Sequence, residues 1–343
     1  MWVVLALLSL LAACGRSATG DSPTPSAAPA PTAASRARNL DATATALTAN
    51  GPPRTPGFFP VNPPPAIASA AANPLLPASP TQPGLPREGT PRSLPGAIGQ
   101  LVPVGGHRLW LACQGSGAPT VVMDAGVNSG SQIWSFVWSA VAASTRVCVY
   151  DRAGLGHSDP IPRPRTSREV VDDLHDLLEN AAIPGPYVLV AHSFGGLNVR
   201  LYASQYPNDV EGLVLVDVVH EDRFAATAKI LTPQQEAAFE QGRQANPEGL
   251  DYYESSRLVR EIGTRLPNIP VIVIARGRPE SWPSGYPVAA LERSWRELAT
   301  DLASRAPQGT LLIAERSDHN IPGQQPAIVI EATRLVVVRV RDR

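Results

Sequence analysis

From residue 100 onward, short runs rich in β-branched and apolar residues alternate with longer amphipathic stretches. This alternation is typical of strands joined by crossover helices, so it predicts an α/β fold built on a mostly parallel sheet. The first two strands are expected to form a hairpin around Gly105 and Gly106. The eight expected strands cover residues 100–104, 107–114, 121–125, 146–151, 187–192, 212–217, 271–275 and 310–314.

Amphipathic periodicity predicts helices at about residues 132–143, 166–182, 194–206, 287–306 and 325–338. Thr166 and Glu169 have the spacing of a capping box at the start of the second helix. A longer insertion, residues 218–267, separates the sixth and seventh strands, and Thr232 and Pro233 predict a helix start within it. Such insertions often form lids, so we expect a helical lid, with a simple extension of the scaffold as the alternative.

The first 96 residues differ in composition from the rest of the chain. They hold 18 of the 36 prolines but only three aromatic residues. A segment with so little apolar material cannot offset the entropy lost on ordering. We therefore expect residues 15–96 to be a disordered linker rich in Pro, Ala, Ser and Thr. Residues 97–343 then form one domain of ordinary size for an α/β fold.

The chain begins with an apolar run, residues 2–13, that is shorter than the roughly 20 residues needed to span a bilayer. It is typical of a secretion signal. Leu11, Ala12, Ala13 and Cys14 resemble the lipobox of bacterial lipoproteins, whose cysteine is lipidated. This resemblance implies a signal peptide over residues 1–14 and an exported domain anchored by lipid to the outer face of a bacterial membrane. An ordinary signal peptide and a secreted protein are the alternative.

The net charge of −1 comes from 29 basic and 30 acidic residues, and no Lys/Arg cluster falls on any expected element. This balance argues against a nucleic acid as a partner, because such partners attract concentrated basic patches. Contact with a membrane is expected only through the lipid anchor at Cys14.

Ser193 ends a buried-strand run and stands at the entry to an expected helix. A nucleophilic serine on such a turn needs small residues two positions before and after it, because the strand and the helix approach closely. Gly195 fits this requirement, and Ala191 departs from the usual glycine but is still small. Helix capping alone would not explain these small neighbours, so Ser193 is the candidate nucleophile.

Around this serine and in three further segments, residues 121–126, 150–159 and 317–319, the chain resembles the α/β-hydrolase superfamily. The resemblance covers nearly all of residues 100–340. It implies an α/β-hydrolase fold with an eight-stranded, mostly parallel sheet flanked by helices and a helical lid after the sixth strand. Because this fold supports many chemistries, the resemblance alone does not name a substrate.

The hydroxyl of serine needs an adjacent base, and a neutral imidazole is suited to this role. His319 follows the last expected strand, in the loop where the superfamily places its base, so the resemblance assigns that role to it. We expect structural or pocket-lining roles for the other five histidines: His107, His157, His175, His192 and His220.

A carboxylate should orient the imidazole of His319. In most relatives this acid follows the seventh strand, where only Glu280 is available, and the known alternative at the end of the sixth strand offers Asp217. We rank Asp217 first, Glu280 second and Asp222 third. We expect the strand of Asp217 to lie next but one to the strand that carries Ser193. Aspartate is also common here in relatives that use the later acid, so the choice stays open.

The resemblance also implies two backbone N–H donors for an oxyanion, Phe194 after the nucleophile and Val127 in the loop after the third strand. Cys113 and Cys148 lie on strands that are neighbours in the superfamily. In an exported protein this placement implies a disulfide, with two buried free thiols as the alternative.

Together, these residues imply a serine hydrolase that cleaves small-molecule carboxylic esters, or amides, through an acyl-enzyme, without a metal or organic cofactor. An acyltransferase or perhydrolase with the same triad is one alternative. A non-catalytic binding module tethered to the cell surface is another. Dehalogenases and epoxide hydrolases with an aspartate nucleophile are disfavoured, because the turn carries Ser193.

Overall fold

The computed structural model describes residues 68–69, 94 and 98–343, apart from residues 163, 245, 247 and 264. The expected signal peptide, Cys14 and most of the expected linker lie outside the described residues. Across the described ranges, no helix combines the length and the apolar character needed to cross a membrane.

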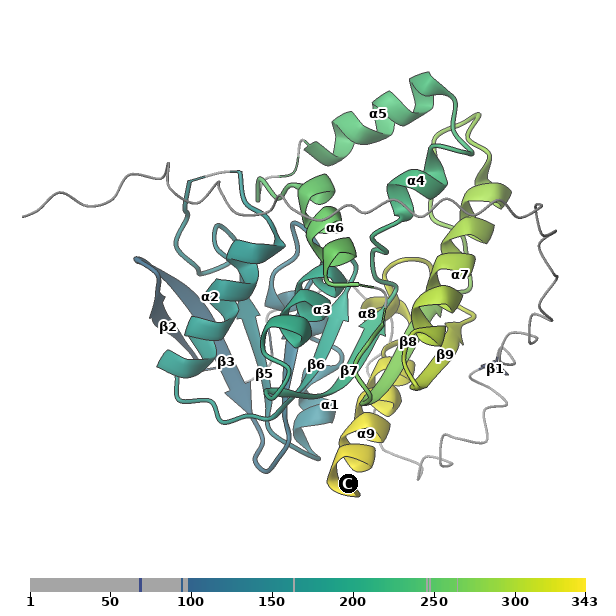
Figure 1. Cartoon of the computed structure of the whole chain (residues 1–343). Helices are drawn as coiled ribbons and strands as arrows, with labels where there is room; N and C mark the ends of the chain where they lie inside the picture. Colours follow the sequence, from purple (N-terminus) through teal and green to yellow (C-terminus); the bar gives the residue numbers. More distant parts are fainter. Residues whose placement is uncertain are drawn as a thin grey trace, which may run out of the picture. The chain divides into compact units, whose positions relative to one another are not determined.

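Within the described residues, nine strands form one sheet in the order β1-β9-β8-β7-β6-β4-β5-β3-β2 (Figure 1). All eight expected strands are present, and only the pairs β2/β3 and β3/β5 are antiparallel. The ninth strand, β1 (Ala68–Ser69), belongs to the segment expected to be a linker and pairs with β9. Two residues are too few to show an alternation of apolar and polar side chains in the sequence. The bounds of the others are β2 (Gly99–Val104), β3 (His107–Gln114), β4 (Thr120–Asp124), β5 (Val147–Asp151), β6 (Tyr187–His192), β7 (Val210–Val216), β8 (Pro270–Arg276) and β9 (Gln308–Ala314).

Helices cover both faces of the sheet, and each face has its own cluster of buried apolar side chains. On one face lie α2 (Ser167–Asn180), α3 (Gly195–Gln205) and α7 (Val288–Ser304). On the other lie η1 (Ser131–Trp134), α1 (Trp138–Ala142) and α9 (Pro326–Arg341). Because both faces are covered, the central parallel strands are buried along their whole length, which explains their continuous apolar sequence.

Most of the predicted helices begin and end close to the predicted residues. Thr166 and Glu169 form the expected capping box at the start of α2. The helix expected over residues 132–143 is instead broken into η1 and α1, and the residues between them include Ser135 and Val137, which have low helix propensity. A short helix, α8 (Ile321–Gln324), also forms where none was expected.

The insertion between β7 and β8 holds three helices, α4 (Arg223–Thr227), α5 (Pro233–Gln244) and α6 (Tyr252–Glu261). As expected, α5 begins at Pro233, and Thr232 and Gln235 exchange hydrogen bonds between side chain and backbone at its start. α6 packs on α2 and α3, so this part of the insertion is joined to the main body of the domain.

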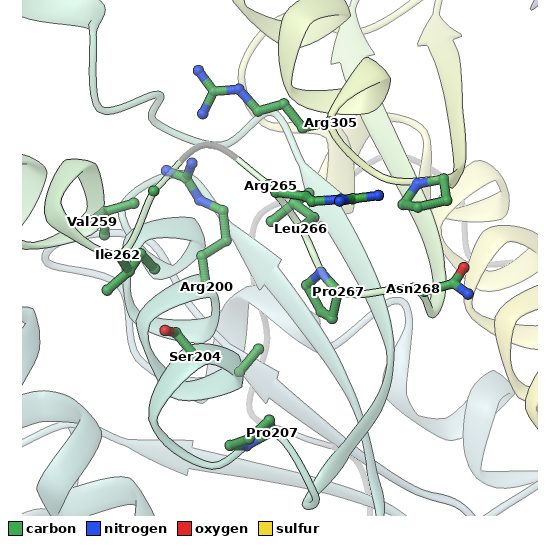
Figure 2. Close-up of a pocket in the computed structure, with 13 residues that line it drawn as sticks. Arg200, Ser204, Pro207, Val259, Ile262, Arg265, Leu266, Pro267, Asn268 and Arg305 are labelled. Carbon is green, nitrogen blue, oxygen red and sulfur yellow. The ribbon is translucent and has the colours of Figure 1, made fainter.

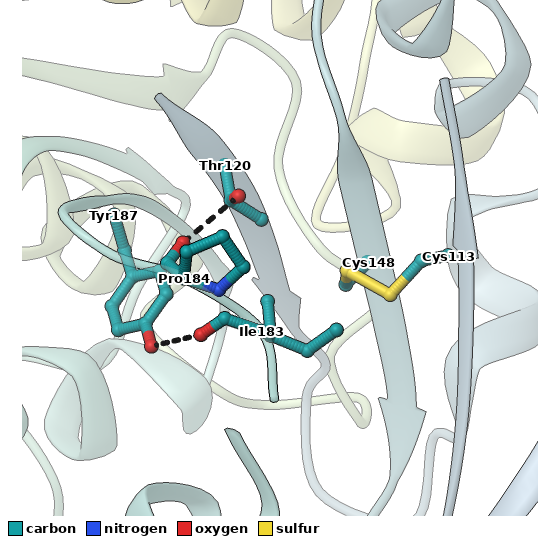
Figure 3. The surroundings of a disulfide bond; sticks show 6 residues. All are labelled: Cys113, Thr120, Cys148, Ile183, Pro184 and Tyr187. Carbon is teal, nitrogen blue, oxygen red and sulfur yellow. Dashed lines mark hydrogen bonds between the residues drawn. A yellow bond between two sulfur atoms is a disulfide. The ribbon is translucent and has the colours of Figure 1, made fainter. Parts of the chain in front are cut away.

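Cys113 on β3 and Cys148 on β5 stand opposite each other across the antiparallel pair and form a disulfide (Figure 3). Beside it, Thr120 Oγ1 donates a hydrogen bond to the carbonyl of Pro184, and the Tyr187 hydroxyl donates to the carbonyl of Ile183. These bonds fix the chain where it enters β6, the strand that leads to Ser193.

Candidate active site

Ser193 stands on a strained turn between β6 and α3. Its φ of 54° lies in the left-handed region, which costs a non-glycine residue roughly 1–2 kcal/mol. The surrounding backbone holds this conformation: the Ser193 N–H donates to Val216 O, and the Val219 N–H donates to Ser193 O. The end of β7 and the segment after it therefore hold the serine in place.

Close packing around the turn explains the small residues beside Ser193. A Cβ added to Gly195 would lie 2.8 Å from the carbonyl oxygens of both Asp124 and Ala125. A Cβ on Gly196 would lie 2.3 Å from Val218 Cβ. These distances are too short for any side chain, so both positions require glycine.

His319 and Asp217 meet beside this turn, with 2.6 Å between His319 Nδ1 and Asp217 Oδ2. Because a carboxylate only accepts hydrogen bonds, the His319 proton is on Nδ1, and Nε2 keeps the lone pair that a base needs. The expectation that β7 lies next but one to β6 is wrong. The two strands pair directly, so Asp217 lies closer to the Ser193 turn than expected.

The structure brings Asp217 to His319, and it places the other two candidate acids elsewhere. Glu280 lies 3.5 Å from Arg276 Nη2. Asp222 pairs with Arg260.

Asp217 is fully buried and surrounded by donors. It accepts hydrogen bonds from the Arg276 backbone N–H at 3.0 Å, from Arg276 Nη1 at 2.9 Å and from Trp295 Nε1 at 2.7 Å. Burial alone would raise the pKa of Asp217, but the hydrogen bond to His319 and the charges of His319 and Arg276 hold that pKa well below its ordinary value. Sequence reasoning missed Arg276 and Trp295, since no motif marks either residue.

The side chain of His319 is 28% exposed, which is compatible with its candidate role as a proton shuttle. Its ring centroid lies 4.6 Å from that of His192, the residue directly before Ser193. Among the described residues, Ser193 Oγ and His319 are not joined by a hydrogen bond. Catalytic hydrogen bonds are often long in unliganded enzymes and tighten when substrate binds.

The side chain of His192 contacts the backbone of His319, the candidate base. His192 Nε2 lies 2.8 Å from the carbonyl oxygen of His319, so Nε2 carries the proton. Burial, together with the nearby His319, lowers the pKa of His192 to about 3, so its imidazole is neutral. His192 Nδ1 is buried without a hydrogen-bond partner and faces Gly126, where an added Cβ would lie 3.1 Å away.

The two candidate oxyanion donors are the backbone N–H groups of Phe194, which follows Ser193 in the chain, and of Val127, in the loop after β4. Within the described residues, neither the Val127 nor the Phe194 N–H has a backbone acceptor. The Val127 loop approaches the serine closely, since a Cβ added to Gly126 would lie 3.5 Å from Ser193 Oγ. Both N–H groups are therefore free to bind an oxygen held at Ser193.

The remaining four histidines lie outside the candidate triad of Ser193, His319 and Asp217. His107 pairs with Asp173, His157 is exposed beside Trp110, His175 stacks on Tyr206, and His220 binds Asp301.

In the described part of the chain, one group of three potential metal ligands is found: His220, Glu221 and Asp222. The ligand atoms of Glu221 are already occupied, because its two oxygens bind Arg200 and Arg305. Two cations on one carboxylate disfavour a metal ion, so the cluster is better explained as a structural link between the insertion, α3 and α7.

A cavity of about 550 Å³ lies between α3, the connection from α6 to β8 and the end of α7 (Figure 2). Three arginines, Arg200, Arg265 and Arg305, and several apolar residues line it. None of the triad residues lines this cavity, so it is separate from the candidate active site.

A family model described as the alpha/beta hydrolase fold matches residues 119–256. The uncharacterized protein YqjL of Bacillus subtilis is 27% identical over 217 residues, which are 63% of this chain and 82% of YqjL. The chain covers only 12 to 40% of the length of several other curated relatives.

Two solved structures show the same architecture. A thermophilic esterase from Thermogutta terrifontis matches with a TM-score of 0.50 and 20% identity, over 71% of this chain and 99% of the esterase. A mutant of a putative epoxide hydrolase from Pseudomonas aeruginosa matches with a TM-score of 0.52 and 18% identity, over 73% of this chain and 98% of its own. The sheet topology and these matches show that the chain has the α/β-hydrolase fold, and they support its place in the α/β-hydrolase superfamily.

Proposed function

We propose that this protein is a serine hydrolase that cleaves small-molecule carboxylic esters. The observation that carries the proposal is the hydrogen bond of 2.6 Å between His319 and Asp217, beside a serine with φ of 54° at a strand-to-helix turn. Neighbours in structure include both an esterase and a putative epoxide hydrolase. A serine at the turn favours acyl transfer, because its oxygen forms an ester with the acyl group.

In the proposed reaction, Ser193 Oγ attacks the carbonyl carbon of the ester while His319 Nε2 takes the hydroxyl proton. Asp217 stabilises the resulting imidazolium. The Val127 and Phe194 N–H groups bind the developing oxyanion, and each such donor contributes roughly 3 kcal/mol. The C–O bond to the alcohol then breaks as His319 returns the proton to the leaving oxygen.

Water completes the cycle. His319 removes a proton from a water molecule, whose oxygen attacks the acyl carbon. Collapse of this second intermediate breaks the bond to Ser193 Oγ, which regains its proton from His319, and the carboxylic acid leaves. An acyltransferase would differ only in the nucleophile that reaches the acyl-enzyme.

The test is labelling with a fluorophosphonate, which phosphonylates an activated serine, followed by turnover of a panel of aryl esters of increasing acyl length. Labelling and turnover are expected in the wild type and lost in Ser193→Ala. The matched control is Ser139→Ala, a change at an exposed serine on α1, which should keep both. A folded wild type that is not labelled would refute the hydrolase and favour a binding module. Labelling with acyl transfer faster than hydrolysis would favour an acyltransferase.

We also propose that the domain is exported and anchored by lipid at Cys14. The disulfide between Cys113 and Cys148 supports export, because disulfides form and persist in oxidising compartments. Cys14→Ser should release the protein from the membrane fraction, and a variant that remains there would refute the anchor.

A further inference from the structure

Arg152, which follows β5, lies buried behind the loop after β4 and uses all five of its N–H groups. Nη1 donates to Asp124 Oδ1 at 2.6 Å and to Ala125 O at 2.7 Å. Nη2 donates to Gly126 O at 2.6 Å and to Glu248 Oε1 at 2.9 Å. Nε donates to Glu248 Oε2 at 2.8 Å. One guanidinium therefore joins β4, the loop and the insertion.

Glu248 belongs to the insertion, between α5 and α6, and is only 3% exposed. Besides its two bonds from Arg152, its Oε1 accepts a hydrogen bond from the backbone N–H of Asn128. Asn128 has a φ of 57°, which a non-glycine residue keeps only when its surroundings hold it. Glu248 thus fixes the loop at two points, directly at Asn128 and indirectly through Arg152.

The bond from Arg152 to Gly126 O acts on the peptide group that carries the candidate oxyanion donor. Gly126 C=O and Val127 N–H belong to one planar trans peptide, so they point in opposite directions. By binding the Gly126 carbonyl, Arg152 fixes the orientation of this peptide plane and therefore the direction in which the Val127 N–H points. A cationic donor on the carbonyl also polarises the peptide and strengthens its N–H as a donor.

We propose that Glu248 is a positioning residue of the oxyanion hole: it holds Arg152 and the Asn128 N–H, so that the Val127 N–H stays aimed at the oxyanion. This inference rests on the proposed function. Because the oxyanion exists only in the transition state and the tetrahedral intermediate, losing Glu248 should lower kcat and leave KM nearly unchanged.

The charges around Arg152 make Glu248→Gln a usable variant. Asp124 remains as a counter-ion for Arg152, and Asn198 Nδ2 donates to the second oxygen of Asp124 at 2.8 Å. The glutamine has the size of glutamate, but it presents an NH₂ group toward the N–H groups of Arg152 in place of one oxygen. Its remaining oxygen can still accept from the Asn128 N–H and Arg152 Nη2, while Arg152 Nε loses its acceptor, so the variant should fold and hold the loop less firmly than the wild type.

The experiment compares the wild type with Glu248→Gln, Glu248→Ala and the matched control Glu254→Gln, a change at a partly exposed acid of α6 in the same insertion. It measures kcat and KM for an aryl ester, the rate constant for labelling by a fluorophosphonate, and the melting temperature. Losing a direct oxyanion donor costs about 100- to 1,000-fold in kcat. Because Glu248 acts through Arg152, its loss should have a smaller effect. Glu248→Gln should lower kcat and the labelling rate about 10-fold, and Glu248→Ala should lower both about 100-fold. KM should change less than about 3-fold in either variant.

The outcomes separate this inference from the proposed function. If the folded Glu248→Gln variant keeps wild-type kcat and labelling, the inference is overturned while the hydrolase stands. A raised KM with unchanged kcat also overturns it, because Glu248 would then bind substrate. If the wild type itself is neither labelled nor active, the proposed function fails and the inference falls with it. Should Glu248→Ala fail to fold, the glutamine variant decides.

Discussion

His192 should make the stability of the fold depend on pH in a defined direction. Burial lowers its pKa to about 3 in the folded state, whereas an unfolded histidine has a pKa of about 6.5. Between these values the unfolded chain binds a proton that the folded chain does not. The free energy of unfolding therefore carries no penalty from His192 above about pH 6.5. As the pH drops from about 6.5 toward 3, it falls by about 1.4 kcal/mol per pH unit.

From pH 7.5 to pH 5, this linkage lowers the free energy of unfolding by about 2 kcal/mol, because pH 5 lies about 1.5 units below the pKa of the unfolded histidine. His192→Gln cannot titrate, and its amide can still donate to the carbonyl of His319. Urea unfolding followed by circular dichroism at pH 5.0, 5.5, 6.0, 6.5 and 7.5 measures the effect in both proteins. The wild type should lose about 2 kcal/mol more than His192→Gln over this range.

A control variant isolates the effect of His192. The side chain of His157 is 74% exposed, so His157→Gln should follow the wild-type curve. Burial also lowers the pKa of His220, but His220 is present in all three proteins and cancels in the difference. Asp217 has a lowered pKa and affects stability only at lower pH. Parallel curves for the wild type and His192→Gln between pH 5 and pH 6.5 would refute the reasoning.

Asp217→Asn should lower kcat for an aryl ester by about 10⁴-fold, because the asparagine cannot hold the required tautomer of His319, whereas Glu280→Gln should keep nearly full turnover. The reverse ranking would assign the acid to Glu280. Gly195→Ala should lower kcat at least about 100-fold, since its Cβ would lie 2.8 Å from the carbonyl oxygens of Asp124 and Ala125; wild-type activity would contradict this packing. Replacing Cys113 and Cys148 by serine opens a cross-link spanning 35 residues and should lower the free energy of unfolding by about 4 kcal/mol in urea titrations. Equal thiol counts in the denatured protein before and after reduction would show that the bond is absent.

The sheet could be predicted from the sequence because buried parallel strands have a distinctive pattern. Strands such as β6 and β8 are buried on both faces, so they appear as continuous apolar runs with sharp ends. The break between η1 and α1 was harder to predict, since Trp134 and Trp138 keep helical spacing across it and both pack into the core. The two-residue β1 gave no signal at all.

The candidate site could be predicted from the sequence only where its residues come after the ends of strands. Ser193 and His319 have this placement, and the order of the segments pointed to both. The choice between Asp217 and Glu280 depends on the direct pairing of β6 with β7 and on Arg276, which engages both acids. Both are tertiary facts that the sequence does not show.

Residues that support the site from far along the chain left no sequence signal. Glu248 reaches Arg152 across 96 positions, and Trp295 reaches Asp217 across 78. Arg152 lies in a segment that carried the superfamily resemblance, so its presence was visible but its contacts were not. For His192, the sequence predicted a structural or pocket-lining role, and only the geometry shows that its side chain binds the backbone of His319.

Arg276 raises a question of charge, since it ends β8, the strand after which most relatives carry the triad acid. Its cation lies 2.9 Å from Asp217 and, acting alone, would weaken the stabilisation that this carboxylate gives to a protonated His319. The same guanidinium also binds both oxygens of Glu292, at 2.9 and 3.0 Å. Burial would raise the pKa of Glu292, but Arg276 lowers it, so Glu292 is ionised. Glu280 also lies 3.5 Å from Arg276 Nη2, so the carboxylates around this guanidinium outnumber it and the group keeps a net negative charge beside the imidazole. Arg276 can therefore fix the orientation of Asp217 without cancelling the charge that His319 needs when it accepts the proton of Ser193.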